Sequence, residues 1–374
     1  MLRLQNTIQP YAWGSPTAIP ALLGTTPDGK PQAELWLGAH PSAPSSTARG
    51  SLDAVIRERP EALLGAAITR HFGPQLPFLL KVLAAAQPLS LQAHPSLEQA
   101  KAGFAREEAA GTPRSAAHRN YKDANHKPEV ICALTDFRAL CGFRSVGDTV
   151  RLFSALGLDV SRLQQDGLRA YFEQVMTLGK TAQRNLVEVV VEGARRGVPG
   201  FDGECALALQ LSQLYPGDVG VIGALLLNLV TLKPGEALYL GAGNLHAYLE
   251  GTGIELMANS DNVLRGGLTP KHVDVPELLS VLKFEDGPAK RLLPVGDVEA
   301  IYETPAPDFR LSRLRLNGAP FTLPARGPQI LLVTDGELEV GGETLKRGDS
   351  VFFGADETVT LSGRGTAFRA TPGL

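Results

Sequence analysis

The chain has 374 residues, and a hydrophobic fraction of 44% is enough to build the cores of two or three domains of roughly 100–200 residues each. A formal net charge of −3 excludes the basic surface that nucleic acids and anionic membranes require. We therefore expect a folded protein whose partner is a small molecule, with neither nucleic acid nor membrane as a partner. An anionic ligand would need a local cluster of cations.

The N-terminal stretch MLRLQNTIQPYAWGS lacks the sustained apolar segment of a secretory signal, and VIGALLLNLV (221–230) is too short to cross a bilayer. The three cysteines, Cys132, Cys141 and Cys205, form no CxxC pair and no even-numbered framework. These features predict a cytoplasmic protein with buried, unreactive thiols.

Up to about residue 145, short runs of β-forming residues alternate with Pro, Gly and Ser, which is typical of antiparallel sheets. One interruption, at 96–110, has helical character, with Ser96 as its N-cap. The runs that we expect to be strands are 33–39, 78–84, 89–94, 129–134 and 137–143.

From Ser145 to about 216, apolar residues recur at helical spacing. Strand signals return in GALLLNLVTL (223–232) and ALYLGA (237–242), which flank the turn KPGE. The helical block is therefore inserted into a β-domain or lies beside it.

The last part, from about 308, contains short strands separated by DG, GG and RGD turns, and this pattern predicts a second small β-barrel or sandwich. No histidine follows His272, so this unit offers no imidazole for a metal. We expect it to have a structural or substrate-covering role.

The run PLSLQAHPS (88–96) places three polar residues at alternate positions. In a strand, Ser90, Gln92 and His94 would share one face, which must then be solvated or bound to a ligand or metal. Taken alone, the run favours a solvated face.

The stretch YKDANHKPEV (121–130) repeats this spacing, because Lys127 and Glu129 would share one face of an extended segment. Pro128 between them indicates the edge or start of a strand. His126 would point the other way, which favours a structural role over that of a metal ligand.

A third segment, 243–272, gathers His246, Glu255, Asp261 and Arg265 among glycines and small polar residues, and this concentration of ionisable groups indicates a site. Lys271 and His272 at its end are interpreted as surface residues. Taken together, the three segments offer one possible set of four metal ligands: Gln92, His94, Glu129 and His246. Two imidazoles with oxygen donors suit zinc or another late divalent ion, which would act as a Lewis acid.

Two long motifs, YKDANHKPE (121–129) and HAYLEGTGIELMANSDNVLRGGLTPK (246–271), resemble those of the type I mannose-6-phosphate isomerases, a family of zinc-dependent enzymes. The resemblance covers most of 5–145 and 220–283. One departure is Gly266, where the family usually has an alanine.

The resemblance implies a mainly β fold with an α insertion. A cupin-type jelly-roll catalytic core would span 1–145 and 217–300, a helical domain 146–216, and a second, small jelly roll 301–374. We expect the chain to act as a monomer on a phosphosugar.

The resemblance also implies one Zn²⁺ per chain, held by Gln92, His94, Glu129 and His246. It assigns catalysis to Arg265 and Lys127, and substrate binding to a further set of Ser90, Glu255, Asp261 and Trp13. The implied reaction interconverts D-mannose 6-phosphate and D-fructose 6-phosphate through a cis-enediolate, for mannose metabolism or GDP-mannose synthesis. Lys127, Glu255, Asp261 and a zinc-bound hydroxide all stay open as the general base, and the residues that hold the phosphate stay open too.

Two other functions are disfavoured by the residues. An iron dioxygenase could use His94, His246 and Glu129, but Gln92 as a fourth ligand would occupy a position that oxygen activation needs. A sugar-binding cupin without catalysis would not need the full set of metal ligands, lysine and arginine. No G-x-G-x-x-R stretch indicates a nucleotidyltransferase.

Overall fold

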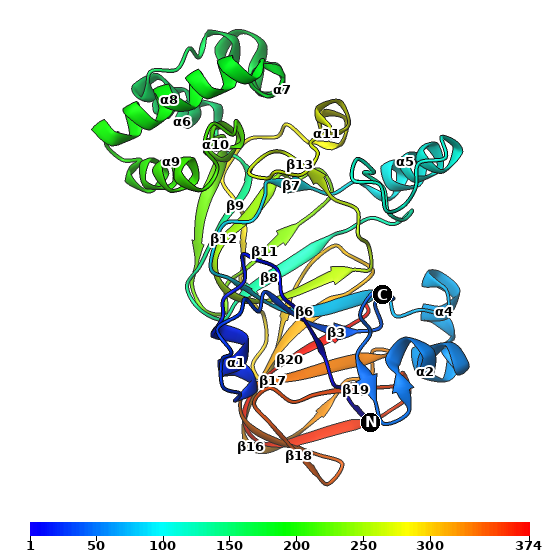
Figure 1. Ribbon diagram of the computed structural model, residues 1–374. Coiled ribbons are helices and arrows are strands. Elements are labelled where there is room, and N and C mark those ends of the chain that lie inside the picture. Colours follow the sequence, from blue (N-terminus) through cyan, green and yellow to red (C-terminus); the bar gives the residue numbers. More distant parts are fainter.

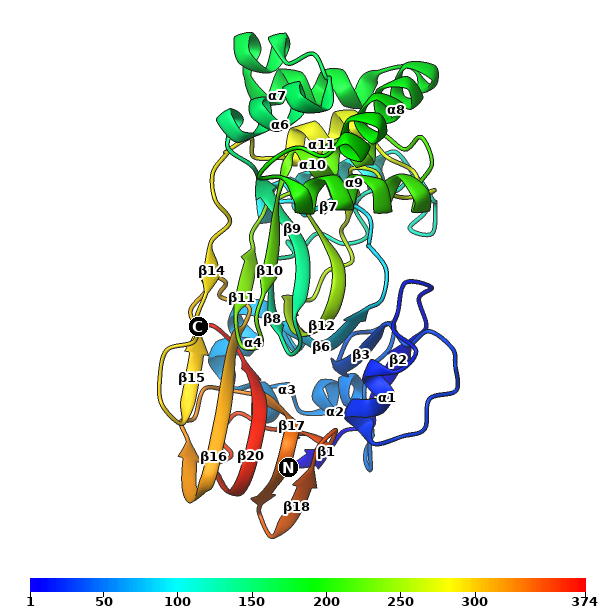
Figure 2. The same ribbon diagram turned by 90° about the vertical axis from the view of Figure 1, so that its left-hand side faces the viewer.

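The computed structural model describes residues 1–374. The molecule is elongated, with a group of helices at one end, a large sheet in the middle and a smaller sheet at the other end (Figures 1 and 2). None of the helices combines the length and apolar character needed to span a membrane.

The central sheet has eleven strands, and all of its strand pairings are antiparallel. Strand β12 organises it, because its first half pairs with β7 and β9 and its second half with β6 and β8. The strands are β2 (Thr7–Gln9), β3 (Glu34–Gly38), β6 (Phe78–Ala85), β7 (Gln92–Ala93), β8 (Glu129–Ala133), β9 (Phe137–Phe143), β10 (Leu227–Leu232), β11 (Ala237–Leu240), β12 (His246–Ala258), β13 (Leu264–Arg265) and β14 (Arg291–Leu292). The strands predicted at 33–39, 78–84, 129–134 and 137–143 are confirmed. In the stretch 89–94, only Gln92 and Ala93 form a strand, which is β7.

Helices in the N-terminal third are more numerous than predicted. The expected helix is α5 (Leu97–Ala109), where Ser96 and Gln99 form a reciprocal capping box. The other four helices are short: α1 (Ala18–Leu23), α2 (Leu52–Glu58), α3 (Pro60–Leu64) and α4 (Ala66–Phe72). Pro60 separates α2 from α3, and Gly65 separates α3 from α4. A two-stranded ribbon of β4 (Ser46–Thr47) and β5 (Gly50–Ser51) precedes α2.

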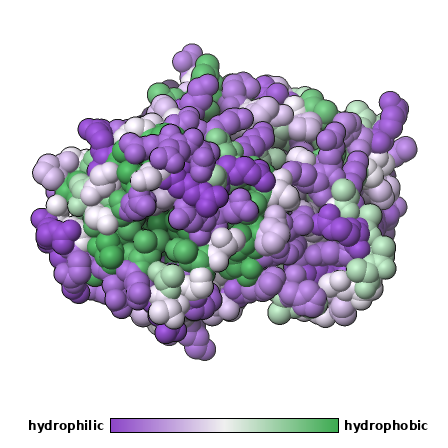
Figure 3. Space-filling view, turned by 90° about the horizontal axis from the view of Figure 1, so that it is seen from above, coloured by the Kyte–Doolittle hydropathy of each residue, from purple (hydrophilic) through white to green (hydrophobic).

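The helical domain buries a cluster of 39 hydrophobic residues against one end of the central sheet. It comprises α6 (Val146–Leu156), α7 (Ser161–Thr177), α8 (Lys180–Arg196), α9 (Asp202–Leu214) and α10 (Gly220–Leu225), and α11 (Val275–Val281) joins the cluster from later in the chain. The strand predicted from 223 was wrong at its start, because α10 occupies those positions and β10 begins at Leu227. Seen from this end, the surface is largely hydrophilic with one hydrophobic area (Figure 3).

The smaller sheet has seven strands and includes the first strand of the chain. Its members are β1 (Leu2–Arg3), β15 (Glu299–Tyr302), β16 (Arg310–Leu323), β17 (Gln329–Val340), β18 (Glu343–Lys346), β19 (Ser350–Phe353) and β20 (Val359–Thr371). The GG and RGD turns lie between strands as predicted. The prediction of a turn at DG was wrong, because Asp335 and Gly336 lie inside β17. The register between β17 and β20 shifts next to these residues, and Gly336 has the positive φ of 72° that this irregularity uses.

The three cysteines are free and buried, which confirms the prediction for the thiols. Burial raises the pKa of Cys132 and of Cys141 to about 11, so both thiols stay protonated at neutral pH.

Candidate active site

Three predicted metal ligands converge at the ends of strands of the central sheet. Glu129 begins β8, His246 begins β12, and His94 follows β7 directly. Their ligand atoms all lie within 4.8 Å of one another, and none of the three residues is more than 2% exposed. Each imidazole Nε2 lies 3.5 Å from a carboxylate oxygen of Glu129. The sheet therefore brings together ligands that are far apart in the sequence.

The two histidines present their Nε2 atoms to this centre. His94 Nδ1 lies 2.7 Å from the carbonyl oxygen of Asn262, and His246 Nδ1 lies 3.0 Å from that of Asn244. A carbonyl only accepts, so each Nδ1 carries the proton and each Nε2 has a free lone pair. Both Nε2 atoms and Glu129 Oε2 are buried without a hydrogen-bond partner, which is costly unless something else binds them. These residues fit a zinc ion.

The electrostatics of the centre keep its ligands in the protonation states that a cation needs. Burial, helped by Lys127, lowers the pKa of His94 to about 4, although Glu129 opposes the shift. Burial acts to raise the pKa of Glu129, but His94 and Lys127 hold it well below its usual value. At neutral pH the centre thus offers a neutral imidazole and a carboxylate.

Gln92 lies between His246 and Arg265 in the sheet. In strand register it faces His246 of β12 on one side and Arg265 of β13 on the other. Its side chain lines the same cavity as Glu129. Gln92 as a fourth ligand remains a prediction.

A cavity of about 560 Å³ is lined by Glu129, one of these three buried residues. Every predicted residue other than His94 and His246 lines it: Trp13, Ser90, Gln92, Lys127, Glu129, Glu255, Asp261 and Arg265. Lys271, interpreted from the sequence as a surface residue, is exposed but also lines this cavity, whereas His272 is exposed and does not.

A buried network on the cavity wall was missed by the sequence analysis. Lys81 Nζ lies 3.1 Å from Glu255 and 3.7 Å from Glu34, and it also lies 5.3 Å from the centre of the Trp36 ring. The Trp36 indole donates to Glu34, and the Tyr248 hydroxyl donates to Glu255 at 2.8 Å. The sequence did hold a signal, because Lys81 is a single charge inside the apolar run FLLKVLA.

This network fixes the charges of its members. Burial acts to lower the pKa of Lys81, but Glu34 and Glu255 raise it above its ordinary value. Burial also raises the pKa of Glu255, and Lys81 opposes that shift. Lys81 therefore stays cationic and is shared between two carboxylates.

Two other cations at the cavity have no carboxylate partner. Arg265 and Lys271 form no ion pair, and burial lowers the pKa of both side chains. The charge of Arg265 lowers the pKa of Lys271 further, so the two groups repel each other. An anionic ligand would relieve this repulsion.

Known proteins match the whole chain. Residues 1–146 match the family described as phosphomannose isomerase type I, catalytic domain. The mannose-6-phosphate isomerase of Salmonella typhimurium is 42% identical over 99% of both chains, and that of Homo sapiens is 35% identical over 96% of this chain and 94% of its own. The chain belongs to the type I phosphomannose isomerases. Their solved structures agree, since the Salmonella typhimurium enzyme bound to fructose 6-phosphate and zinc superimposes with a TM-score of 0.92 at 40% identity, over the full length of both chains.

Proposed function

We propose that this phosphomannose isomerase interconverts D-mannose 6-phosphate and D-fructose 6-phosphate with one zinc ion per chain. The observation that carries the proposal is the centre of buried ligand atoms without partners at His94, Glu129 and His246. Glu129 lines the same cavity as Arg265 and Lys271, two cations without a carboxylate partner. A structure of a 40% identical relative bound to fructose 6-phosphate and zinc supports the proposal.

The zinc ion would be held by His94, Glu129 and His246, with Gln92 as the fourth ligand. When bound, zinc supplies positive charge that polarises sugar oxygens. A neutral fourth donor would leave this charge less compensated than a second carboxylate would.

Arg265 would stabilise the negative charge that develops on the sugar oxygens during proton transfer. It pairs with Gln92 in the sheet and lines the same cavity as Glu129, and its side chain forms no ion pair with a carboxylate. A guanidinium keeps its charge throughout the reaction, so it acts as a fixed electrostatic partner.

The phosphate would bind Lys271, with the Ser90 hydroxyl as a further donor. Among the lysines of the cavity, Lys81 and Lys127 are already paired with carboxylates, which leaves Lys271 free. Lys271 is also the most exposed of them, and a dianionic phosphate is easier to hold at the edge of a cavity, where it stays partly hydrated.

Lys127 would act beside the reacting carbons. Its Nζ lies 3.3 Å from Glu129, and its side chain is only 11% exposed. Lys127, Glu255 and Asp261 all stay candidates for the general base. Trp13, which stacks on Tyr11 at 5.7 Å, would cover the sugar.

We also propose that the chain is a cytoplasmic monomer that serves mannose metabolism or GDP-mannose synthesis. Its free cysteines suit a reducing compartment. The antiparallel pairing of both sheets supports two cupin-type jelly rolls. We propose a core at 1–145 and 217–300, a helical domain at 146–216 and a second jelly roll at 301–374, to whose sheet β1 and all of β15 also belong.

A coupled assay for fructose 6-phosphate tests the function. Purified protein should convert mannose 6-phosphate, lose this activity in a chelator and regain it when zinc is added back. Full activity in metal-free protein would contradict the proposal, as would oxygen uptake on iron loading without isomerase activity on zinc loading.

A further inference from the structure

The short segment that carries Lys127 is held firmly at its two ends. At one end, the carbonyl oxygen of Asn125 accepts hydrogen bonds from Asn262 at 2.9 Å and from Ser260 at 3.2 Å. At the other end, the carbonyl oxygen of Pro128 accepts one from the Ala258 amide at 3.1 Å. Both ends are therefore fixed to the chain around the end of β12.

Between these ends the main chain has no such support. The amide of His126 bonds only to the side chain of its neighbour, Asn125, and the main chain of Lys127 forms no hydrogen bond. A segment without main-chain hydrogen bonds is free to shift unless its side chains hold it. The position of Lys127 thus depends on side-chain contacts.

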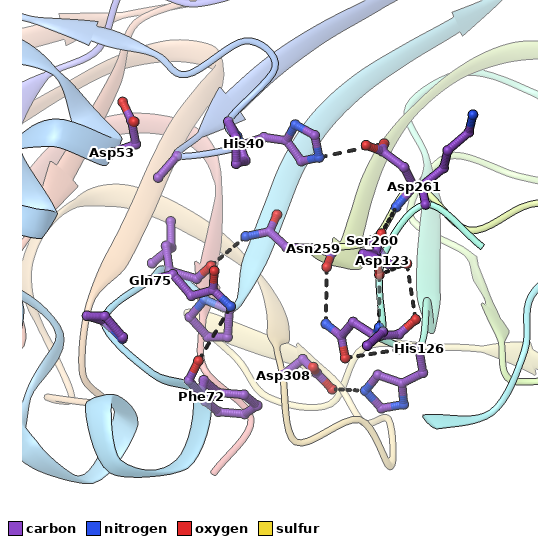
Figure 4. Close-up of a pocket in the computed structure, with 18 of the residues that line it drawn as sticks. His40, Asp53, Phe72, Gln75, Asp123, His126, Asn259, Ser260, Asp261 and Asp308 are labelled. Carbon is purple, nitrogen blue, oxygen red and sulfur yellow. Dashed lines mark hydrogen bonds and ion pairs between the residues drawn. The ribbon is translucent and has the colours of Figure 1, made fainter. Parts of the chain in front are cut away.

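The side chain of His126 supplies one such contact, to the C-terminal part of the chain. Its Nε2 lies 2.9 Å from Asp308, which sits between β15 and β16 (Figure 4). An ionised carboxylate only accepts, so Nε2 donates. Asp308 is 2% exposed and has no other hydrogen-bond or ion-pair partner, which makes His126 the one group that compensates its burial.

The two neighbouring side chains lie on opposite sides of the segment. Lys127 lines the 560 Å³ cavity, whereas His126 and Asp308 line a second cavity of about 990 Å³. Consecutive residues of an extended chain alternate in this way. This agrees with the sequence interpretation that His126 is not a metal ligand.

We infer that Asp308 is a positioning residue of the isomerase reaction: through His126 it fixes the main chain at Lys127 and so orients the Lys127 ammonium group. The inference rests on the proposed role of Lys127. It gives the C-terminal sheet a part in the reaction, although no residue of that sheet lines the cavity of the metal centre.

The test compares Asp308→Ala with Asp308→Asn. The alanine variant loses the acceptor for His126, so we expect kcat to fall about 10-fold or more, since small displacements of a reacting group are costly. Its KM should stay within about 2-fold of the original value and its zinc content should not change, because the lesion reaches neither the phosphate nor the metal. The side-chain amide introduced by Asp308→Asn still offers an acceptor oxygen, so this variant should keep kcat within about 3-fold.

A double-mutant cycle separates positioning from plain support of the fold. If Asp308 acts through Lys127, then Lys127→Ala combined with Asp308→Ala should be no slower than Lys127→Ala alone. Additive losses would overturn the inference, and so would an Asp308→Ala variant that loses thermal stability but keeps its kcat. If Lys127→Ala itself keeps full kcat, the proposed role of Lys127 fails, whatever the Asp308 variants do.

Glu299→Gln is the matched control. Glu299 is a buried carboxylate of the same C-terminal sheet, paired with Arg369 at 2.8 Å, and it touches neither His126 nor Lys127. The Glu299→Gln substitution should lower the stability of the protein without changing kcat. If Asp308→Ala does not fold, His126→Gln, whose amide can still donate to Asp308, is compared with His126→Ala. His126→Gln should then keep a higher kcat than His126→Ala, and equal kcat values in the two variants would contradict the inference.

Discussion

Arg265 of β13 pairs with Gln92 of β7, and both residues line the cavity that Glu129 also lines. We expect Arg265→Ala to lower kcat about 100- to 1,000-fold with zinc retained, because a preorganised positive group would be missing where charge develops. Steady-state kinetics with metal analysis checks this. Arg265→Lys should recover only part of the rate, since lysine lacks the planar fork. A loss confined to KM would reduce Arg265 to a substrate binder.

Lys271 should contribute mainly to binding. Removing its charge in Lys271→Ala takes away the proposed phosphate partner, so KM for mannose 6-phosphate should rise about 10-fold while kcat changes little. Kinetics at low and high salt measure this, and the difference from the parent should shrink as salt screens the charge. Lys290→Ala, an exposed lysine outside the cavity, is the control. An unchanged KM in Lys271→Ala would place the phosphate elsewhere.

His246 should be required for both metal and activity. His246→Ala removes one of two imidazoles, and the remaining ligands should bind zinc too weakly to retain it through purification. Metal analysis and circular dichroism would then show a folded protein without zinc or turnover. His272→Ala alters an exposed histidine of the same segment and should keep both. Full zinc occupancy in His246→Ala would rule out the ligand role.

Lys81 should be important for stability. In Lys81→Met, the carboxylates of Glu34 and Glu255 would remain buried without their shared cation, so we expect a loss of about 3–5 kcal/mol in the free energy of unfolding. Urea unfolding measures it. Adding Glu255→Gln should restore part of the loss, because one of the two uncompensated charges is removed. A Lys81→Met protein as stable as its parent would show that the network is not ionised as described.

His40 should make stability depend on pH. It is 5% exposed, and burial lowers its pKa below the ordinary 6.5, as do Lys81 and Lys127, while Asp261 at 3.6 Å and Asp123 oppose the shift. Protons therefore bind the unfolded chain more tightly, and the free energy of unfolding should fall as pH drops below about 6.5.

Urea midpoints at pH 7, 6 and 5 test this pH dependence. His40→Gln should show a shallower decline than the parent protein. His118→Gln, which changes an exposed histidine, should leave the decline unchanged. A His40→Gln protein with the parent's slope would mean that His40 takes up its proton as readily in the folded state as in the unfolded chain.

The sequence predicts this molecule well where the local pattern decides the structure. The apolar runs of β6 and β9 and the helical periods from 145 to 214 need no long-range information. The stretch 52–72 was missed, because Pro60 and Gly65 cut it into helices of five to seven residues, too short to show a clear period. The Asp335–Gly336 pair suggests a turn locally, but pairing with β20 keeps it inside a strand.

Some residues of the candidate site could likewise be predicted from the local sequence, and others could not. The proposed metal ligands lie in two long motifs and one alternating run, and three of them, His94, Glu129 and His246, lie together in the structure. The role of Lys81 depends on the register of three strands, which sets Lys81 opposite Glu255 on one side and Trp36 on the other. A local sequence pattern does not show which residue of a neighbouring strand lies opposite, because the register of the sheet decides this.

Strand β1 pairs with β19, so Leu2 faces Phe352 across the smaller sheet. During synthesis β1 leaves the ribosome long before its partner strand, which appears only after residue 350 has been made. The central sheet, whose strands lie between residues 7 and 292, can assemble earlier. Strand β1 is thus made long before it can reach its final place, and the smaller sheet keeps one edge open until then.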